Sequence, residues 1–513
     1  MTDPKISALY VAVQEINSLI QTGASCSRSL EEKIVEHLES SQLLGKLPKN
    51  GNLEEVFMEV TKHGLRISSQ KSRLVKLRIP LIELVLLTTF VDGFGKTHAV
   101  FVEKSTTTRY QLHLLQLADD MAANVLCSLV KNAFIEAEEA SALIEAIQGI
   151  PGLSVAVSVD GKMVWRSGFG YANLESSAKC TANSVMRIAS ISKPITATLA
   201  AQLVENGKLD LDEDIRKYLS EFPAKKFENE DVTITMRHLL SHSAGIRHYG
   251  NPKKKSGSLE DPSNNNTETA EFLSNKRYSN SIEALEIFKN DDLVVKPGSK
   301  FSYTTYGLTL AGAVLEKCSG RTYRQLANGL FSDLGMRHTQ LDSNNKIVPG
   351  RVNYYHRNSS NELENCPEVD CSYKYAGGGI ISNVTDLVIF ANAILHSYQL
   401  DTRTNLINRE TIRKFISEQV PIDNKVKGTT SVGLGWFLVD GKDVKSLNGN
   451  VANSSFFYHT GAAVGASSVL LIKPGDSESQ TTSGVCVAIL CNLQNCSVYN
   501  LGRDIGDLFY NSM

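Results

Sequence analysis

The spacing of apolar residues separates an N-terminal region, residues 1–134, from the rest of the chain, residues 135–513. In the first region most apolar positions recur three or four residues apart, which predicts helices. The predicted helices lie at 6–20, 29–44, 53–64 and 109–148, the last as one or two long helices, and a strand-like stretch covers 79–103. The pattern therefore predicts a mostly helical N-terminal extension, which we interpret as an interaction or assembly domain.

The C-terminal region begins and ends with strand patterns. Residues 152–172 alternate around Asp160-Gly161, which predicts a hairpin. Two more strands are predicted at 465–474 and 484–492, followed by a helix at 498–512. The stretch between the hairpin and these strands is mainly helical in pattern.

Ser190 and Lys193, in the stretch RIASISKPIT at 187–196, are the first candidates for chemistry. Residues three apart share one face of a helix, so the lysine amine reaches the serine hydroxyl if the segment is helical. Ser192 is adjacent to Lys193 in sequence and would point away from it. Apolar periodicity up to Gly207 predicts this helix. A serine that only caps the helix is the alternative interpretation.

A helix start suits a serine nucleophile with a lysine base. The first N–H groups of a helix are unpaired and carry partial positive charge, which favours an oxyanion and disfavours an ammonium. Burial lowers the pKa of a lysine in the same direction. Lys193 would then be neutral often enough to accept the proton of Ser190, as in Ser-Lys enzymes.

Two later stretches supply partners for this pair. Tyr303, in FSYTTYG, stands before another apolar-periodic segment, and His459-Thr460-Gly461 opens an alternating strand. Taken singly, such a tyrosine is usually a core residue, and the triplet is nearly uninformative. The fixed order of these motifs after Ser-x-x-Lys is a much stronger signal.

This order of motifs resembles that of serine beta-lactamases and penicillin-binding proteins. The surrounding sequence is similar to the animal mitochondrial serine beta-lactamase-like proteins, which are class C-like serine hydrolases. The similar stretches run from about residue 135 to the C-terminus and include MRIASISK, GKLDLDEDIRKYLSEFP, RHLLSHSAGIRHY, FSYTTYG, YAGGGIISNVTDL, GLGW and HTGAAVGASS. The resemblance implies an α/β (α+β) fold. Its first and last strands share an antiparallel sheet flanked by helices, and the active site lies where this sheet meets a helical lobe.

The resemblance also implies a role for each motif residue. Ser190 would be the acylated nucleophile, Lys193 its proton acceptor, and Tyr303 the relay that passes the proton to the leaving group. The residues of the strand beside the substrate would be His459, Thr460, Gly461 and Ala462. The backbone N–H groups of Ser190 and Ala462 would form the oxyanion hole.

Two positions depart from the family's pattern. Thr305 stands where class C enzymes often have asparagine, and His459 stands where the strand motif usually begins with lysine. Both changes alter groups that would hold a beta-lactam, so they disfavour beta-lactam hydrolysis and leave acyl transfer untouched. A histidine with an ordinary pKa is mostly neutral at neutral pH, so His459 is expected to attract carboxylates weakly. Tyr249, which follows SAGIRH, is expected to overhang the site and contribute to substrate binding.

Composition narrows the function without identifying it. The 513 residues carry a formal net charge of −2, which gives no reason to expect a nucleic-acid partner. No cofactor and no metal are expected, and we interpret His238, His242 and His248 as structural histidines. An insertion at about 251–280, rich in Asn, Ser, Lys and Glu, is expected to be flexible and solvated.

The sequence thus predicts a serine hydrolase that acts on peptides and accepts esters, with an esterase or a weak beta-lactamase as the alternative enzyme. A self-assembling scaffold that keeps the fold, as a homo-oligomer or filament, is the alternative without catalysis. The longest apolar run, 79–91, is too short to span a bilayer, so no membrane span is expected. The resemblance implies a mitochondrial location, whereas the N-terminus lacks a clear presequence and favours the cytoplasm.

Overall fold

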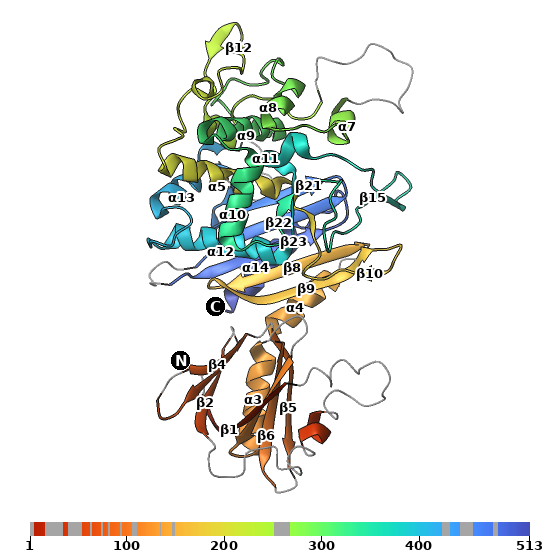
Figure 1. Cartoon of the computed structure of the whole chain (residues 1–513), viewed down its shortest axis with the longest axis vertical. Helices are drawn as coiled ribbons and strands as arrows, with labels where there is room; N and C mark the ends of the chain where they lie inside the picture. Colours follow the sequence, from red (N-terminus) through yellow and green to blue (C-terminus); the bar gives the residue numbers. More distant parts are fainter. Residues whose placement is uncertain are drawn as a thin grey trace. The chain divides into compact units, whose positions relative to one another are not determined.

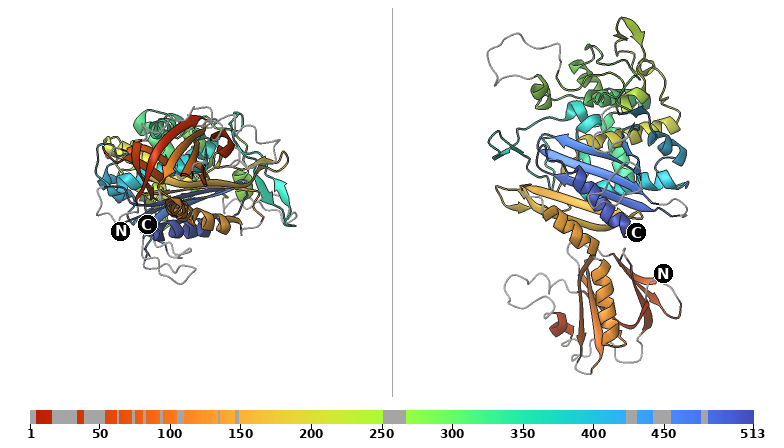
Figure 2. Two further views of the ribbon diagram at one scale, coloured as in Figure 1. Left: turned by 90° about the horizontal axis from the view of Figure 1, so that it is seen from below. Right: turned by 180° about the vertical axis from the view of Figure 1, so that it is seen from behind.

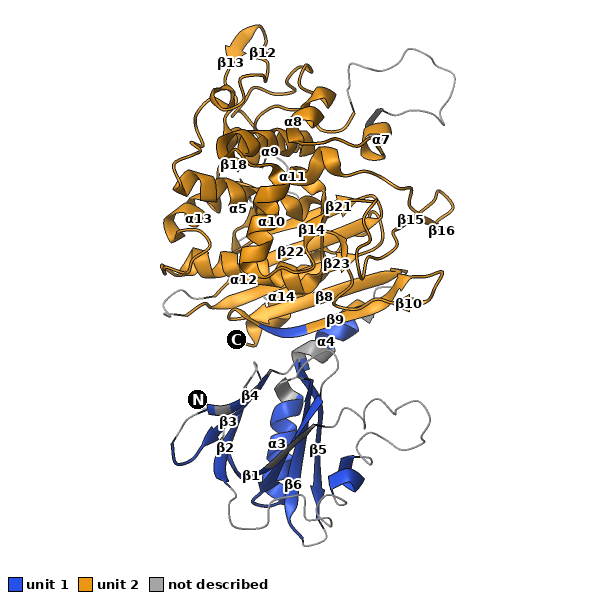
Figure 3. Cartoon of the chain, in the orientation of Figure 1, with its two compact units in different colours: residues 1–143, 163–165 blue, residues 144–162, 166–513 orange. Residues whose placement is uncertain are grey.

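The chain is described from a computed structural model (Figures 1 and 2). The described residues are 5–15, 34–38, 54–61, 64–72, 75–80, 83–92, 95–104, 110–133, 135–145, 149–250, 267–422, 431–441, 455–475 and 481–513. They belong to two compact units (Figure 3). Unit 1 comprises residues 1–143 and 163–165, and unit 2 comprises residues 144–162 and 166–513. Within the described ranges, no helix combines the length and the apolar character needed to cross a membrane.

Unit 1 is built on one antiparallel sheet of seven strands in the order β4-β3-β2-β1-β7-β6-β5. The strands are β1 Lys5–Glu15, β2 Glu54–Thr61, β3 Gly64–Ser69, β4 Val75–Pro80, β5 Leu84–Val91, β6 Thr97–Lys104 and β7 Tyr110–Leu117. The helices α3 Asp120–Ala133 and α4 Ile135–Glu145 follow, and α3 packs on the sheet. Its buried Leu126 and Val130 pack with Val56 and Met58 of β2 in one core. In the strand order of the described residues, β4 and β5 are the two edge strands.

The prediction of a mostly helical N-terminal extension is wrong. The helices predicted at 6–20 and 53–64 are strands β1 and β2, and the one predicted from 109 begins with strand β7. In β2 the buried Val56, Met58 and Val60 alternate with the more exposed Phe57 and Glu59, which is the two-residue period of a strand. Short apolar runs satisfy both periods, and sheet pairing decided between them. The strand-like stretch 79–103, the helical residues 34–38, and α3 with α4 agree with prediction.

Unit 2 contains a nine-stranded antiparallel sheet in the order β10-β9-β8-β23-β22-β21-β20-β19-β18. The strands are β8 Gly152–Val159, β9 Lys162–Asn173, β10 Ala178–Lys179, β18 Val420–Pro421, β19 Ser431–Val432, β20 Phe437–Val439, β21 Phe456–Ala463, β22 Ala466–Pro474 and β23 Gly484–Cys491. The predicted hairpin is β8 with β9, joined by Asp160 and Gly161 in the left-handed region at φ 51° and 76°. The first strand pairs with the last, β8 with β23, as the resemblance implied.

Both faces of this sheet are covered by helices. Helices α12 Val384–Gln399 and α14 Tyr499–Asn511 each pack on β8, β22 and β23, and α14 lies behind the sheet in Figure 1 and in front of it in the right view of Figure 2. Every residue of β8 and β23 is therefore buried, which explains why both sequences lack charged residues and are mostly apolar.

The helical lobe of unit 2 comes from the middle of the sequence. Its helices are α5 Ser192–Glu205, α6 Met236–Leu240, α7 Thr267–Phe272, α8 Ser281–Ala284, α9 Thr305–Ser319, α10 Tyr323–Leu334, α11 Tyr375–Gly378 and α13 Arg409–Phe415. Short 3-10 helices are η2 Ala189–Ile191, η3 Ile215–Lys217, η4 Leu285–Ile287 and η5 Ser372–Lys374. Helix α5 packs on α9 and α11, and η2 at its start packs on β21 of the large sheet. This contact places the start of α5 where the lobe meets the sheet.

Smaller strands complete unit 2. They are β11 Met186–Arg187, β14 Gln340–Leu341 and β17 Ile380–Ser382 in a three-stranded sheet, and the hairpins β12 Lys225–Phe227 with β13 Glu230–Val232 and β15 Tyr355–Arg357 with β16 Leu363–Asn365. Of the insertion predicted at about 251–280, residues 251–266 lie outside the described residues. The remainder contains α7 and leads to α8.

Candidate active site

Ser190 lies on η2, two residues before α5 begins. The preceding Ala189 has φ 50°, in the left-handed region that few residues other than glycine adopt. The Oγ atom of Ser190 is 2.8 Å from Nζ of Lys193, the contact expected from their spacing of three residues. The Ser192 hydroxyl is buried and donates to the Ala189 carbonyl at 2.7 Å. Ser190, and not Ser192, therefore faces the lysine.

Lys193 has no exposed surface. Burial lowers its pKa well below the ordinary lysine value, and repulsion from the Lys374 ammonium lowers it further. An N–H of the amine donates to the Gly377 carbonyl at 2.6 Å, which fixes the direction of Nζ. The neutral amine then has a lone pair for the proton of Ser190.

Tyr303 precedes α9, whose first turn is capped by the Thr304 side chain accepting from the Gly307 N–H. Its phenol donates to Ser190 Oγ at 2.8 Å. Burial raises the Tyr303 pKa, so the phenol keeps its proton at neutral pH. Its ring also lies 4.8 Å from Lys193 Nζ. Two proton-carrying groups thus converge on one serine oxygen.

Strand β21 forms the opposite wall. Gly461 has no room for a side chain, because a Cβ there would lie 2.4 Å from the Ile188 carbonyl and 2.2 Å from Ser468 Oγ. Without a side chain at this position, β21 runs directly against the backbone that leads into Ser190. Ala462, the next residue, lines the same pocket as Ser190.

His459 does not line this pocket. Its ring is 2% exposed, with Nδ1 2.6 Å from the Thr460 carbonyl oxygen. Burial and the nearby Lys193 lower the His459 pKa to about 3, so the ring is neutral. The structure therefore agrees with weak carboxylate attraction at this position and places the ring behind the pocket wall.

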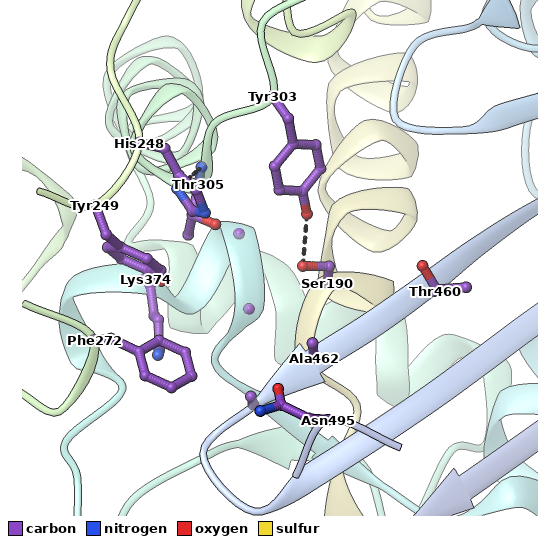
Figure 4. Close-up of a pocket in the computed structure, with 13 residues that line it drawn as sticks. Ser190, His248, Tyr249, Phe272, Tyr303, Thr305, Lys374, Thr460, Ala462 and Asn495 are labelled. Atoms are coloured by element: carbon purple, nitrogen blue, oxygen red, sulfur yellow. Dashed lines mark hydrogen bonds between the residues drawn. The ribbon is translucent and has the colours of Figure 1, made fainter. Parts of the chain in front are cut away.

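The pocket around Ser190 has a volume of about 480 Å³ (Figure 4). It is lined by Ser190, His248, Tyr249, Phe272, Tyr303, Thr305, Lys374, Gly377, Gly378, Thr460, Ala462, Ala463 and Asn495. The sequence-predicted residues among them are Ser190, Tyr303, Thr305, Thr460, Ala462 and Tyr249. Lys193 does not line the pocket but contacts Ser190, which does. His459 and Gly461 also do not line it, although they belong to β21, the strand that forms one wall of the pocket. In Figure 4, Tyr249, Lys374 and Phe272 lie on the side of the pocket away from Thr460.

The sequence did not identify Lys374, Phe272 or the two glycines as pocket residues. Both glycines belong to the run AGGG at 376–379. A Cβ on Gly377 would lie 2.8 Å from the Thr305 side chain, and the Gly377 carbonyl accepts from Lys193. The close approach of α9 at Thr305 is thus the reason for a glycine here. Phe272 ends α7, at the end of the predicted insertion, where composition gave no functional signal.

The three histidines of RHLLSHSAGIRHY are held by structural contacts. His238 completes the capping box of α6, and His242 accepts from the Thr304 N–H at 3.2 Å. His248 accepts from the Thr305 N–H at 3.3 Å, and burial with nearby cations lowers its pKa to about 4. Among the described residues no group of three or more His, Cys, Asp or Glu side chains is placed to hold a metal ion.

Known proteins match both parts of the chain. The family model described as Beta-lactamase matches residues 140–504, and the one described as Beta-1 integrin binding protein matches residues 8–142. The mouse protein named Serine beta-lactamase-like protein LACTB, mitochondrial, is 36% identical over 414 residues, 68% of this chain and 75% of its own. The human protein of that name is 36% identical over 408 residues, 68% of this chain and 74% of its own.

Two solved structures resemble the fold. The octameric penicillin-binding protein homologue from Pyrococcus abyssi has a TM-score of 0.59 and 22% identity, covering 74% of this chain and 78% of its own. The D-amino acid amidase from Ochrobactrum anthropi SV3 has a TM-score of 0.57 and 19% identity, covering 74% of this chain and 99% of its own. At these identities the likeness concerns the fold alone.

The two pocket tyrosines differ in their contacts, and we expect different consequences from removing their hydroxyls. Tyr303→Phe should lower the rate of Ser190 acylation by about a hundredfold or more, the scale of a positioned proton relay. Tyr249→Phe should mainly change the concentration of acylating agent needed for half-maximal rate, because Tyr249 lines the pocket without a bond to Ser190. Single-turnover acylation kinetics separate the two effects. The reverse pattern would transfer the relay to Tyr249.

Proposed function

This chain belongs to the beta-lactamase family, and we propose that it is a serine hydrolase that forms an acyl-enzyme on Ser190. The observation that carries this proposal is the double contact of Ser190 Oγ, 2.8 Å from Lys193 Nζ and 2.8 Å from the Tyr303 phenol. A serine nucleophile needs an adjacent base and a path for its proton, and this pair supplies both.

In the proposed reaction, the neutral Lys193 amine removes the proton of Ser190 while Oγ bonds to the substrate carbonyl carbon. The backbone N–H groups of Ser190 and Ala462 stabilise the resulting oxyanion. Tyr303 then passes a proton to the leaving nitrogen or oxygen as its bond to carbon breaks, and Lys193 passes the proton that it took to Tyr303, which restores both groups. A water molecule then bonds to the carbonyl carbon of the acyl-enzyme, and the bond between this carbon and Ser190 Oγ breaks. This step releases the acid and restores Ser190.

We expect amide bonds in peptides as the main substrates, with esters accepted. The amidase among the structural neighbours supports the choice of an amide only as an analogy within the fold. Thr305 and the buried, neutral His459 argue against efficient beta-lactam hydrolysis. An esterase or weak beta-lactamase is the alternative, and comparison of rates on matched amide and ester substrates separates them.

Two further proposals concern the location of the chain in the cell and its assembly. The mammalian relatives carry the word mitochondrial in their names, which supports a mitochondrial location over the cytoplasm for this chain. A self-assembling scaffold without catalysis is disfavoured, because it would not need Ser190, Lys193 and Tyr303 in bonding contact. Assembly of an active enzyme into a homo-oligomer or filament stays a prediction.

We also propose that unit 1 binds an extended protein segment. Its match to a family described as Beta-1 integrin binding protein supports this, as do the edges of its sheet, where β4 and β5 each pair on one side only among the described strands. The β5 edge is the better candidate, because α3 packs beside it and both elements carry exposed apolar side chains. These side chains are Val85 and Val91 on β5, and Met121 and Val125 on α3.

Covalent labelling tests the proposed hydrolase. A fluorophosphonate probe should add one label to the native chain, on Ser190, and Ser190→Ala should abolish it. Ser192→Ala, the neighbouring control, should still be labelled because the Ser192 hydroxyl is bonded to the backbone. Intact mass and peptide mapping report the adduct. Labelling that persists in Ser190→Ala, or that maps to Ser192 or Ser243, would contradict the assignment.

Peptide binding tests the role of unit 1. The full chain should bind at least one of a set of labelled peptides that cover beta-1 integrin, with saturation in fluorescence anisotropy. Val85→Glu should weaken binding about tenfold or more, because it puts a charge on the apolar edge. Ile347→Glu is the matched control, since Ile347 is an exposed apolar residue of unit 2. Equal effects of both variants, or no saturable binding, would refute this proposal.

A further inference from the structure

Lys374 is a buried cation at the edge of the active-site pocket. It ends η5 directly ahead of α11, is 3% exposed and lines the pocket that contains Ser190. Its Nζ atom lies 5.7 Å from the ring centre of Tyr249, 5.2 Å from that of Phe272 and 5.1 Å from that of Tyr373. Figure 4 shows its side chain between Tyr249 and Phe272. Aromatic faces attract an ammonium, so these rings favour the charged form.

Other buried cations of unit 2 have oxygen partners. Arg187 binds Asp342 at 2.9 Å, Arg247 binds Glu271 at 2.9 Å, and Lys473 binds Asp507 at 2.6 Å. Lys225 donates to two backbone carbonyls at 2.5 and 2.7 Å. Across the described ranges, Lys374 has neither a carboxylate within ion-pair distance nor an oxygen acceptor for Nζ. A buried charge without a partner is costly, and rings offset only part of that cost.

The remaining ionisable groups near Ser190 do not supply positive charge. His459 and His248 are neutral, since burial lowers their pKa values to about 3 and about 4. Lys193 is neutral as well, and its amine is already engaged by Ser190 and Gly377. Of the described residues that line the pocket, Lys374 alone is a lysine or an arginine.

We propose that Lys374 binds a carboxylate of the substrate, so that this hydrolase prefers substrates with an anionic group some bonds away from the scissile carbonyl. This inference rests on the proposed function and specifies its substrate class. Tyr249 and Phe272 would cover the apolar part between the two groups, since both line the pocket beside Lys374. A substrate with an ammonium at the same place would be repelled. In this proposal Lys374 on η5 attracts the substrate carboxylate, in place of the lysine that usually begins the strand motif where this chain has His459.

A second role for Lys374 predicts a different pattern. Its charge also lowers the pKa of Lys193, so removing it would alter nucleophile activation. That effect acts on every substrate equally. Recognition of a carboxylate acts only on substrates that carry one, so the ratio of two substrates separates the roles.

The test compares kcat/KM within two ester pairs. Mono-4-nitrophenyl adipate and 4-nitrophenyl hexanoate differ by a carboxylate on the acyl part, whereas 4-acetoxybenzoate and 4-methylphenyl acetate differ by one on the leaving group. Lys374→Met should lower the ratio of charged to neutral substrate by about 10- to 100-fold in one pair, the scale of a charge-assisted hydrogen bond. The pair that responds identifies the part of the substrate bound. Lys374→Arg should keep most of the ratio, and the exposed Lys208→Met should not change it.

A measurement on the native chain does not depend on the folding of a variant. Adipate should slow fluorophosphonate labelling of Ser190 at lower concentration than hexanamide does, because hexanamide carries no carboxylate. Equal protection by both compounds, together with equal losses on all four esters in Lys374→Met, would overturn the inference. Ser190 labelling in the native chain distinguishes this failure from failure of the proposed function, in which no label would appear at all.

Discussion

The burial of one lysine amine against a serine oxygen is the constraint on which the site depends. In water the Lys193 amine would hold its proton at neutral pH, and a protonated amine accepts nothing from Ser190. Because Lys193 is fully buried, its pKa is lowered and the neutral amine is favoured. The Gly377 carbonyl accepts from this amine and directs it toward Ser190. The fold gives up stability at this point, because the unfolded chain would bind a proton there that the native chain does not bind.

Elements that are distant in sequence build the enclosure. Strand β21 reaches the serine because Gly461 leaves no side chain between them, and Ser468 of β22 donates to the Ile188 carbonyl at 2.9 Å. Arg187, just ahead of the nucleophile, binds Asp342 at 2.9 Å and the Val464 carbonyl at 2.8 Å. The serine segment is thus fastened to the large sheet on one side and to the helical lobe on the other. The folded chain also surrounds Lys374 with aromatic rings, and in our proposal its ammonium group binds a carboxylate of the substrate.

Sequence patterns predicted what depends on local spacing and motif order. The contact of Ser190 with Lys193 follows from a helix turn, and Tyr303 and Thr460 follow from their motifs. Strand β2 of unit 1 was predicted as a helix because it carries apolar residues at both helical and strand spacing, and only pairing with β1 and β3 decides between them. Lys374 was missed because its importance arises from the absence of a partner, which depends on the whole tertiary environment. His459 was expected to line the strand beside the substrate, but it is buried and is not among the residues that line the pocket, which spacing could not predict.

The free energy of unfolding of Lys193→Met, compared with the native chain over pH, tests the central claim most directly. Between the lowered pKa of the folded state and the ordinary value of about 10.5, the unfolded native chain binds one more proton than the folded chain, so native stability rises with pH. Methionine removes this dependence. We expect the variant to be more stable by about 1–3 kcal/mol near pH 7, with a difference that shrinks toward pH 10 in urea unfolding. A variant that is less stable near pH 7, by an amount independent of pH, would show that Lys193 is charged in the native chain and would contradict the account.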